Sequence, residues 1–335
     1  MKNKRVLVLT DHSGHSAENS VYALVRGFHA SGRCSKIDVA SRGDKKNHAF
    51  FHELKAGKLF ACQTDEAFDF DPAKESFTRD SEAVSLADYD LIFFRLPHPT
   101  TQEFLEWLPT VFTNGPIIND PRGIMQTSTK AFLLNFPEAC APIQLCRSVA
   151  EVEAFAEQFP IVLKPLREYG GKGILKVADG VVNDGSTNYS AADYLPQLRE
   201  ELAEHGMLAM QFLERVGNGD KRILVVDGEI QAASLRLPAP ASWLCNVAQG
   251  GTSVPAEVSQ EEEAIIQLIA PKLKEAGILI FGADTLEGND GKRLLSEVNT
   301  MSIGGFPQAQ VQTGRPIIAR TITKLLDYVD AYHGR

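Results

Sequence analysis

The dipeptide Asp227-Gly228 constrains the fold of this chain more than any other feature. It separates two runs rich in β-branched and aliphatic residues, Arg222–Val226 and Glu229–Arg236. An Asp-Gly pair between two such runs is a strong signal for a two-residue β-hairpin, because both turn residues need a positive φ angle. The sequence therefore predicts an antiparallel sheet in the second half of the chain.

The N-terminal part of the chain has the pattern of an α/β domain. A buried strand at Arg5–Thr10 is followed by a helix over 20–30, and Leu91–Phe94 reads as a second buried strand. Arg95 follows this strand directly, and ligands of open α/β sheets bind where the strands end. We therefore expect a Rossmann-like domain over residues 1–122.

Short strands and helices alternate through the rest of the chain. The expected helices are 128–135, 150–158, 260–276 and 316–332. The expected strands, besides the hairpin, are 117–118, 161–163, 174–177, 207–212, 279–284 and 294–298. We predict two further lobes, 123–206 and 207–335. The segment 41–85 is mixed, aromatic and charged, and its helices and strands cannot be placed from the sequence.

Charge and cysteine usage exclude several functional classes. The formal net charge of −9 removes the broad attraction that nucleic acid or an anionic membrane needs. No stretch approaches the roughly 18 apolar residues of a membrane span. The five cysteines form no C-x-x-C pair, which is typical of thiols in a reducing compartment. We expect a cytoplasmic protein that acts on small molecules, with neither nucleic acid nor membrane as a partner.

An acidic set stands at the ends of two predicted strands. Period-two alternation places Glu297 and Asn299 on one face, and Asp284 ends the strand before them. Two carboxylates and an amide oxygen are hard ligands of the kind that hold Mg²⁺ beside nucleotide phosphates. Asp284 taken alone is more easily explained as a solvated residue at a strand end than as a metal ligand, because acidic residues prefer the surface. The complete set predicts a magnesium site.

Two lysines stand where a nearby anion would explain them. Lys164 ends an apolar strand before a turn with Gly170 and Gly171, and glycine backbone can lie close over a phosphate chain. Lys130 opens a predicted helix, at the positive end of the helix dipole. Either lysine alone is also compatible with an exposed position. No G-x-x-x-x-G-K-[ST] motif occurs, so the chain has no P-loop.

Other polar positions fit a nucleotide site only when they are taken together. Gln211, Phe212 and Leu213 end an apolar strand and form a hinge whose backbone could hydrogen-bond adenine. Arg222 and Arg236 lie on the two strands of the hairpin and could clamp phosphoryl oxygens. Each of these residues alone fits the protein surface better.

The order of these pieces resembles the ATP-grasp signature, most closely that of the bacterial glutathione synthetases. The matching positions are Lys130, Lys164 with its glycine turn, Gln211–Leu213, Gly219-Asp220-Lys221-Arg222, Arg236, Asn246 with Gly250-Gly251, Asp284 and Glu297-Val298-Asn299. The likeness is strong between Ser128 and Ser302 and weaker in the first domain. It implies an N-terminal α/β (pre-ATP-grasp) domain followed by a two-lobed ATP-grasp fold, with ATP between the lobes.

The resemblance also implies a role for each site residue. ATP would be bound by Lys130, Lys164, Gly170, Gly171, Gln211, Phe212, Leu213 and Asn246. Asp284, Glu297 and Asn299 would hold two Mg²⁺ ions, for which Mn²⁺ could substitute. Arg222, Arg236 and Asn299 would stabilise the transferring phosphoryl group and the oxyanion of amide formation. Arg95 and Ser302 would lie near the substrate.

The chain departs from the family at three places. It has Arg95-Leu96-Pro97-His98-Pro99 where the family has Arg-Lys-Asp-Pro-Pro. It has Ser302-Ile303-Gly304 in place of Ser-Pro-Thr, and Arg167-Glu168 in place of Asp-Gly. These positions surround the acid and amine substrates rather than ATP, so the nucleotide chemistry carries over more directly than the substrates do.

The sequence thus favours an ATP-dependent carboxylate–amine ligase that works through an acyl phosphate and joins γ-glutamylcysteine to glycine. One alternative is another ATP-grasp peptide or amino-acid ligase, similar to the glutamate ligases or the D-alanine ligases. The other is an ATP-binding module without catalysis, against which the complete set of metal ligands counts. We expect a homo-oligomer, and the sequence reveals no general base.

Overall fold

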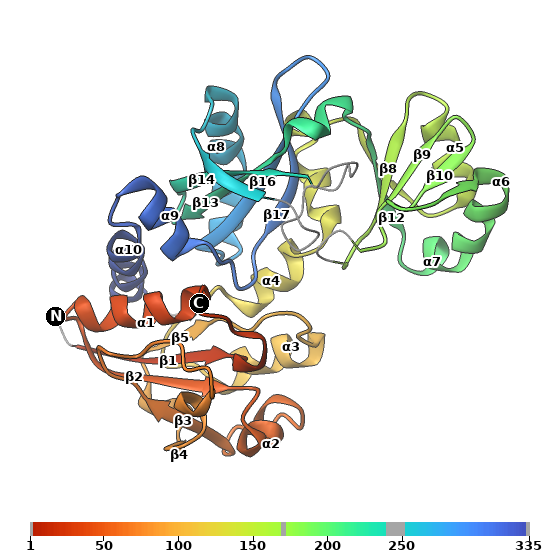
Figure 1. Cartoon of the computed structure of the whole chain (residues 1–335). Helices are drawn as coiled ribbons and strands as arrows, with labels where there is room; N and C mark the ends of the chain where they lie inside the picture. The colour runs from red at the N-terminus through yellow and green to blue at the C-terminus, as the bar shows by residue number, and fades with distance from the viewer. Residues whose placement is uncertain (1–2, 169–171, 239–251, 333–335) are drawn as a thin grey trace.

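The computed structural model describes residues 3–168, 172–238 and 252–332, and these residues form three sheets (Figure 1). The first sheet belongs to an N-terminal domain. The second and third belong to two lobes, and the second sheet stands apart from the other two in the view of Figure 1. Mixed α/β architecture is therefore confirmed.

The first sheet has the order β4-β3-β2-β1-β5-β6. Its strands are β1 (Lys4–Thr10), β2 (Cys34–Ser41), β3 (Leu59–Gln63), β4 (Glu82–Val84), β5 (Leu91–Phe94) and β6 (Ile117–Ile118). The strands β1, β2, β5 and β6 run parallel, whereas β3 and β4 pair antiparallel. The strands predicted at 5–10 and 91–94 are confirmed.

Helices cover both faces of the first sheet, which explains why β1 is apolar at successive positions. Val6 and Val8 pack into the cluster that includes α1 (Ser20–Ala30), whose bounds are those predicted. Leu7 and Leu9 pack into the opposite cluster, which includes α3 (Gln102–Val111). All four side chains are fully buried.

The unassigned segment 41–85 forms β3, β4 and several short helices. These are η2 (Lys45–Asn47), α2 (His48–Phe51) and η3 (Glu75–Phe77), with η1 (His12–Gly14) and η4 (Leu86–Asp88) nearby. Phe50, Phe51 and Phe77 are buried. The aromatic residues that hid any periodicity therefore belong to the core of the domain.

The second sheet is antiparallel and has the order β11-β10-β9-β8-β12-β7. Its strands are β7 (Ile143–Cys146), β8 (Ile161–Pro165), β9 (Leu175–Ala178), β10 (Val181–Asn183), β11 (Asn188–Ser190) and β12 (Met207–Gln211). The helices α5 (Val149–Ala156), α6 (Ala191–Tyr194), η7 (Leu195–Leu198) and α7 (Arg199–Glu204) lie in this lobe. The predicted hairpin of β8 and β9 is confirmed. β12, the first strand after the division that we place at residue 207, pairs with β8 and β7 of this sheet.

The third sheet is also antiparallel, with the order β15-β14-β13-β16-β17. Its strands are β13 (Asp220–Val226), β14 (Glu229–Leu237), β15 (Thr252–Ala256), β16 (Ile280–Glu287) and β17 (Arg293–Asn299), and η8 (Glu214–Asn218) leads into it. Asp227 and Gly228 have φ angles of 49° and 76°, so the predicted hairpin is confirmed.

Helices cover both faces of the third sheet as well. Ile223 and Val225 share a cluster with α8 (Gln260–Glu275), and Leu224 and Val226 share one with α9 (Phe306–Thr313) and α10 (Ile317–Ala331). α10 also packs against α1, which joins the two ends of the chain (Figure 1). None of the helices in the described ranges is long and apolar enough to cross a membrane.

The helix predicted at 128–135 is wrong in type and bounds. An α-helix, α4 (Pro121–Thr127), comes first, and the 3₁₀ helices η5 (Lys130–Asn135) and η6 (Pro137–Ala139) follow. The Asp120 side chain accepts the Arg122 N–H, and Pro121 takes the first helical position. Asn119-Asp120-Pro121 reads as a turn in sequence, but Asp followed by Pro is equally a helix start.

Asn119 joins the first domain to the third sheet. It is 6% exposed, and its Nδ2 donates to the carbonyls of Ile280 and Thr300 at 2.6 Å each. Its Oδ1 accepts the N–H groups of Leu279 and Ile280 at 3.0 and 2.9 Å. One side chain therefore satisfies four backbone groups of β16, β17 and their flanks.

We predict that Asn119→Leu lowers the free energy of unfolding by about 4 kcal/mol or more, because four backbone groups lose their partner and each buried polar group left unpaired costs about 1–3 kcal/mol. Chemical denaturation followed by circular dichroism measures the loss. Asn114→Leu is the matched control, because Asn114 is exposed and donates a single hydrogen bond, to Ala87. Equal midpoints for the two variants would contradict the role of Asn119.

Candidate active site

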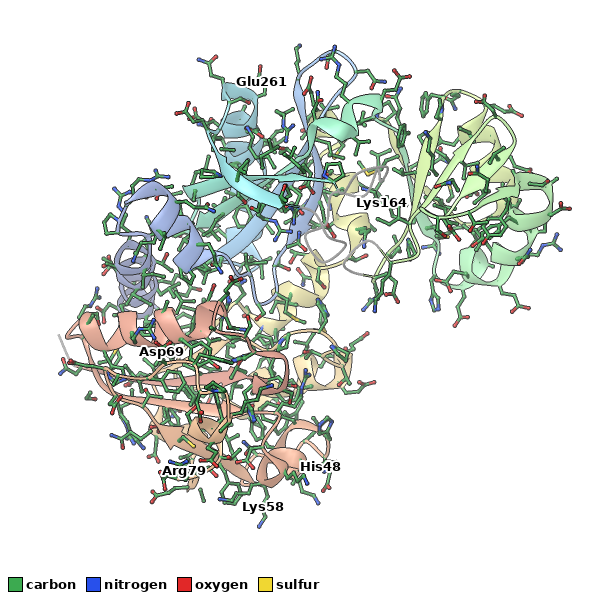
Figure 2. The ribbon with its side chains drawn as sticks, viewed as in Figure 1. His48, Lys58, Asp69, Arg79, Lys164 and Glu261 are labelled. Atoms are coloured by element: carbon green, nitrogen blue, oxygen red, sulfur yellow. The ribbon has the colours of Figure 1, made fainter. Side chains whose placement is uncertain are left out.

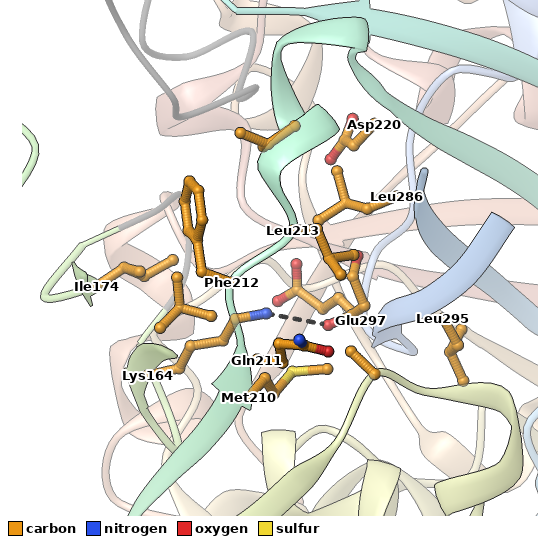
Figure 3. Close-up of a pocket in the computed structure, with 14 residues that line it drawn as sticks. Lys164, Ile174, Met210, Gln211, Phe212, Leu213, Asp220, Leu286, Leu295 and Glu297 are labelled. Atoms are coloured by element: carbon orange, nitrogen blue, oxygen red, sulfur yellow. Dashed lines mark hydrogen bonds between the residues drawn. The ribbon is translucent and has the colours of Figure 1, made fainter. Parts of the chain in front are cut away.

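A pocket lies between the first lobe and the third sheet (Figure 3). Its apolar walls are formed by Val162, Ile174, Met210, Leu213, Leu286 and Leu295. Its polar lining includes Lys164, Gln211, Asp220 and Glu297. A narrow apolar slot that opens on charged groups suits a flat base carrying a phosphate chain.

Lys164 reaches across this pocket. It lies on β8 opposite Leu208 of β12, and its Nζ donates to the carbonyl of Ser296 on β17 at 3.3 Å. Figure 3 shows this contact as a dashed line, with Glu297 beside it. Desolvation lowers the pKa of Lys164, and the Glu297 carboxylate opposes this shift. Lys164 therefore lines a pocket, and its contact with the nucleotide stays a prediction.

Lys130 approaches Glu297 from the other side. It is 9% exposed, its Nζ lies 3.9 Å from Glu297 Oε1, and it also donates to the carbonyl of Glu168. Burial lowers its pKa, while Glu297 opposes this effect. Two lysines of the first lobe thus face one carboxylate of the second.

The acids and arginines of the third sheet lie opposite one another in register. Asp284 of β16 faces Glu297 of β17 on one side and Arg222 of β13 on the other. Asp220 of β13 faces Arg236 of β14. Five charged side chains therefore gather on four neighbouring strands at the edge of the pocket.

Asp284 is held by both arginines. Arg222 Nε and Nη2 donate to its two oxygens, the second at 2.7 Å, and Arg236 Nη2 lies 2.8 Å from Oδ2. Burial alone would raise the pKa of Asp284, but Arg222 and Arg236 hold it below its usual range. Asn299 Nδ2 lies 3.3 Å from Asp284 Oδ2, so the three predicted metal ligands are together.

Asp220 is a site residue that the sequence reading placed in a motif without giving it a role. It lines the pocket, and its two oxygens accept from Arg236 Nε and Nη2 at 2.6 and 2.5 Å. Burial and the neighbouring Asp284 raise its pKa to about 6. The signal in the sequence is an acid two residues before Arg222 on a hairpin strand whose partner carries Arg236.

The residues that follow β12 lie at the pocket, and their contact with adenine stays a prediction. The N–H groups of Gln211 and Phe212 donate to the carbonyls of Pro142 and Pro160 at 2.9 and 2.7 Å. The ring of Phe212 carries Lys176 Nζ at 3.7 Å from its centre, a contact that the sequence did not indicate. Gln211, Phe212 and Leu213 all line the pocket.

Arg95, which follows β5 of the first domain, lies beside Ser302, which follows β17 of the third sheet. Ser302 Oγ donates to the Arg95 carbonyl at 3.0 Å, and Arg95 Nη2 donates to the carbonyl of Ile303. Arg95 is 4% exposed, and its Nε has no hydrogen-bond partner among the residues that the structure describes. Desolvation lowers its pKa to about 10. No carboxylate in the described ranges forms an ion pair with it.

Three predicted ATP contacts, Gly170, Gly171 and Asn246, lie outside the described residues. In the described part of the chain, no group of three or more His, Cys, Asp or Glu side chains could hold a metal. The predicted ligand set does not meet this criterion, because it has only two carboxylates and its third ligand is the Asn299 amide. The assignment of these three ligands thus stays a prediction.

The comparisons with known proteins agree with this geometry. The family described as "Prokaryotic glutathione synthetase, ATP-grasp domain" matches residues 129–314. A glutathione synthetase of Rhodopseudomonas palustris is 30% identical over 252 residues, which cover 74% of this chain and 75% of that protein. One of Neisseria meningitidis is 27% identical over 329 residues, 94% of this chain and 96% of its own length.

A solved structure supports the same fold. The crystal structure of the D-cycloserine synthetase DcsG aligns with a TM-score of 0.66 over 97% of this chain and 99% of its own, at 14% identity. At that identity the likeness concerns the fold alone. The sequence relatives and the family match go further: the chain belongs to the prokaryotic glutathione synthetase family and is an ATP-grasp ligase.

Proposed function

We propose that this ligase joins γ-glutamylcysteine to glycine while ATP is cleaved to ADP and phosphate, through an acyl phosphate. The observation that carries the proposal is that Lys164 of one lobe and Glu297 of the other line the same pocket, with Lys130 Nζ 3.9 Å from Glu297 Oε1. The names of the sequence relatives support the choice of substrates.

We place the adenine of ATP in the apolar part of the pocket and its phosphates at the charged part. The apolar slot receives adenine, and because the N–H groups of Gln211 and Phe212 already bind carbonyls, we assign the adenine contact to Leu213. The phosphates then extend toward Lys164 and Lys130. Two cations close together favour a polyanion strongly where burial weakens screening by water.

ATP-grasp ligases use ATP with a divalent metal, and we propose two Mg²⁺ ions, replaceable by Mn²⁺, at Asp284, Glu297 and Asn299. Such ions neutralise phosphate charge during phosphoryl transfer. The donor set fits, because two carboxylates and an amide oxygen are hard ligands. Asp284 can serve only when Arg222 and Arg236 release it, and this release leaves both guanidinium groups for the phosphoryl group and the oxyanion.

Arg95 is the cation that we assign to the acid substrate. A buried guanidinium with no acidic partner among the described residues is costly unless an anion joins it. γ-Glutamylcysteine carries two carboxylates. The protein is acidic overall, so the attraction for this substrate must come from fixed groups of this kind.

A second candidate is another peptide or amino-acid ligase of the ATP-grasp type, similar to the glutamate or D-alanine ligases. The loop after β5, where the chain departs from the family, lines a hollow together with residues of α4 and of the segment after β8. A substrate that differs from those of the family would be recognised by the residues of this hollow.

We also propose a cytoplasmic location. The described cysteines, Cys34, Cys62, Cys140 and Cys146, are free thiols, and burial raises the pKa of each. Thiols of this kind fit a reducing compartment. The homo-oligomer stays a prediction.

The experiment that tests the function is an ADP-release assay with candidate acids and amines, each alone and in pairs. γ-Glutamylcysteine and glycine together should release ADP, and neither alone should sustain it. If only another pair does so, the glutathione assignment fails and the ligase survives. If no pair does, the ATP-binding module is the better interpretation.

We predict that Glu297→Gln lowers turnover at least tenfold at saturating magnesium, equivalent to about 1.4 kcal/mol or more of transition-state stabilisation, because the charged ligand is lost while the shape is kept. The coupled ADP assay measures it. Glu261→Gln is the control, since Glu261 is exposed on α8, far from Lys164 (Figure 2). Activity above about a tenth of the wild type would remove Glu297 from the metal site.

Lys164→Met should weaken ATP binding far more than binding of the acid, because methionine keeps the packing of the side chain's stem and removes only the charge. Calorimetry with a non-hydrolysable ATP analogue measures the affinity. Lys58→Met, at the outer end of the first domain in Figure 2, should leave it unchanged. An unaltered affinity in Lys164→Met would show that this lysine does not touch the nucleotide.

Arg95→Ala should raise the apparent KM for γ-glutamylcysteine by the equivalent of about 1.5–3 kcal/mol, the range for a lost charge-assisted hydrogen bond. The KM for ATP should change little. Arg79→Ala, an exposed arginine of the same domain, is the control. A parallel rise in both KM values would indicate a general disturbance instead of a lost substrate contact.

A further inference from the structure

A chain of buried hydrogen bonds runs from α1 to the end of β5 in the first domain. Its central member is His15, whose Nδ1 lies 3.1 Å from the Tyr22 hydroxyl and whose Nε2 lies 3.1 Å from Thr10 Oγ1. Thr10 Oγ1 in turn donates to the backbone carbonyl of Arg95 at 3.3 Å. Tyr22, His15 and Thr10 are 2%, 8% and 0% exposed, so the chain is shielded from water.

The Thr10 hydroxyl fixes the direction of this chain. It has one proton and donates that proton to the Arg95 carbonyl, so Thr10 Oγ1 accepts the hydrogen bond from His15 Nε2. A neutral imidazole carries a proton on only one ring nitrogen. Nδ1 of His15 is therefore the acceptor, and the Tyr22 hydroxyl is the donor. Each proton of the chain points from α1 toward Arg95.

Burial keeps the chain in the protonation state that this direction requires. Desolvation lowers the pKa of His15 to about 4, although the Asp11 carboxylate opposes this shift. Desolvation also raises the pKa of Tyr22 to about 12. At neutral pH the imidazole is therefore uncharged and the phenol keeps its proton. The rings of Tyr22 and Phe77 both meet the His15 ring edge to face, with centres 5.5 Å apart, and this packing fixes the plane of the imidazole.

The residue at the end of the chain is held by its backbone and open at its side chain. The Arg95 N–H donates to the Leu9 carbonyl at 2.8 Å, and the Arg95 carbonyl accepts from Ser302 Oγ as well as from Thr10 Oγ1. The guanidinium donates through Nη2 to the carbonyl of Ile303. Nε of Arg95 is buried and has no partner among the residues that the structure describes. The backbone contacts therefore decide where this free donor lies.

We infer that this chain positions Arg95 for the acid substrate and that Thr10 and His15 are positioning residues, which act only through the Arg95 carbonyl. The inference rests on the proposed function, in which Arg95 binds a carboxylate of γ-glutamylcysteine. A guanidinium that pairs with a carboxylate depends on the placement of its backbone, because charge-assisted hydrogen bonds are short and directional.

The same domain contains a second pair of this kind that does not reach the site. His29 Nε2 lies 2.9 Å from Thr64 Oγ1, which donates to the carbonyl of Ile37 at 2.9 Å. Ile37 lies in the middle of β2, whereas Thr10 pairs with Ser41 at the carboxyl end of that strand. The two threonines thus make the same two contacts, but only one of them bonds a carbonyl of a candidate site residue. Thr64 therefore provides a matched control.

The test compares Thr10→Val with Thr64→Val, since valine keeps the branched side chain and removes the hydroxyl. We expect Thr10→Val to raise the KM for γ-glutamylcysteine about three- to tenfold, the range for a lost hydrogen bond, and to change the KM for ATP and kcat less than about twofold. The ADP-release assay with saturating glycine measures all three. Thr64→Val should lower the midpoint of thermal unfolding as Thr10→Val does, but leave both KM values unchanged.

Two further variants separate positioning from a loss of stability. Thr10→Ser keeps the hydroxyl and should return the KM for γ-glutamylcysteine to within about twofold of the wild type. Tyr22→Phe keeps the ring and removes the donor farthest from Arg95, and it should raise the same KM alone. If Thr10→Val leaves the KM for γ-glutamylcysteine unchanged, or raises both KM values in parallel, the inference is overturned while the ligase function stands.

The direction of the chain has a test that needs no substrate. Nitrogen NMR of protein labelled at histidine distinguishes protonated from unprotonated ring nitrogens, and His15→Phe identifies the signals. At neutral pH we expect a proton on Nε2 of His15 and none on Nδ1. A proton on Nδ1, alone or together with one on Nε2, overturns the inference.

Failure of the proposed substrate is distinguishable from failure of this inference. If γ-glutamylcysteine and glycine release no ADP with the wild type, the proposed substrate fails, and the two valine variants are compared with the acid that the assay identifies. A rise in the KM for that acid in Thr10→Val alone supports the inference. If no acid supports ADP release, the inference fails as well, because it requires an acid at Arg95.

Discussion

The site depends on one extra residue in β17. Residues 285–287 of β16 pair one to one with residues 295–293 of β17, and the register then shifts by one residue between Thr285 and Asp284. Ser296 is the residue that β17 gains there, and its carbonyl accepts Lys164 Nζ. Without this bulge Asp284 would face Ser296 instead of Glu297. A bulge that re-aims side chains next to an active site is a recurrent device, and here it pairs Asp284 with Glu297 and brings the Ser296 carbonyl to Lys164 of the other lobe.

The acids and arginines of the third sheet neutralise one another, and this lowers the cost of burying their charges when no ligand is bound. Asp284 is 1% exposed, and an unpaired charge there would be very costly. Arg222 and Arg236 compensate it, and Asp220 holds Arg236 in turn. The same groups are the ones that metal and phosphate would engage. In the function that we propose, binding would therefore exchange one set of ion pairs for another, and a protein with a net charge of −9 would hold a polyanion locally.

Sequence patterns predicted the elements that follow local rules. The hairpin at Asp227-Gly228, the helix α1 and the strand that carries Lys164 were all predictable, because turn chemistry and periodicity decide them. The pairing of Asp220 with Arg236 was not, since a second bulge, between Leu224 and Val225, shifts the register by one residue. Bulges leave no periodic signal in the sequence. The residue that faces a given charged residue on the neighbouring strand therefore cannot be predicted from the sequence. The burial of Lys130 and the aromatic core of segment 41–85 depend on tertiary packing in the same way.

The parts of the site that share the family's sequence and those that depart from it are anchored differently. The nucleotide side is built on strands whose register is fixed by sheet hydrogen bonds. The substrate side is built on the loop after β5, which Arg42 and Thr100 hold by its carbonyls. Contacts to backbone carbonyls do not depend on which side chains the loop carries. The loop can therefore exchange residues, as it has at Leu96, Pro97 and His98, while its path stays the same. If the site residues have the roles that we propose, a ligase built this way could change its acid or amine without disturbing phosphoryl transfer.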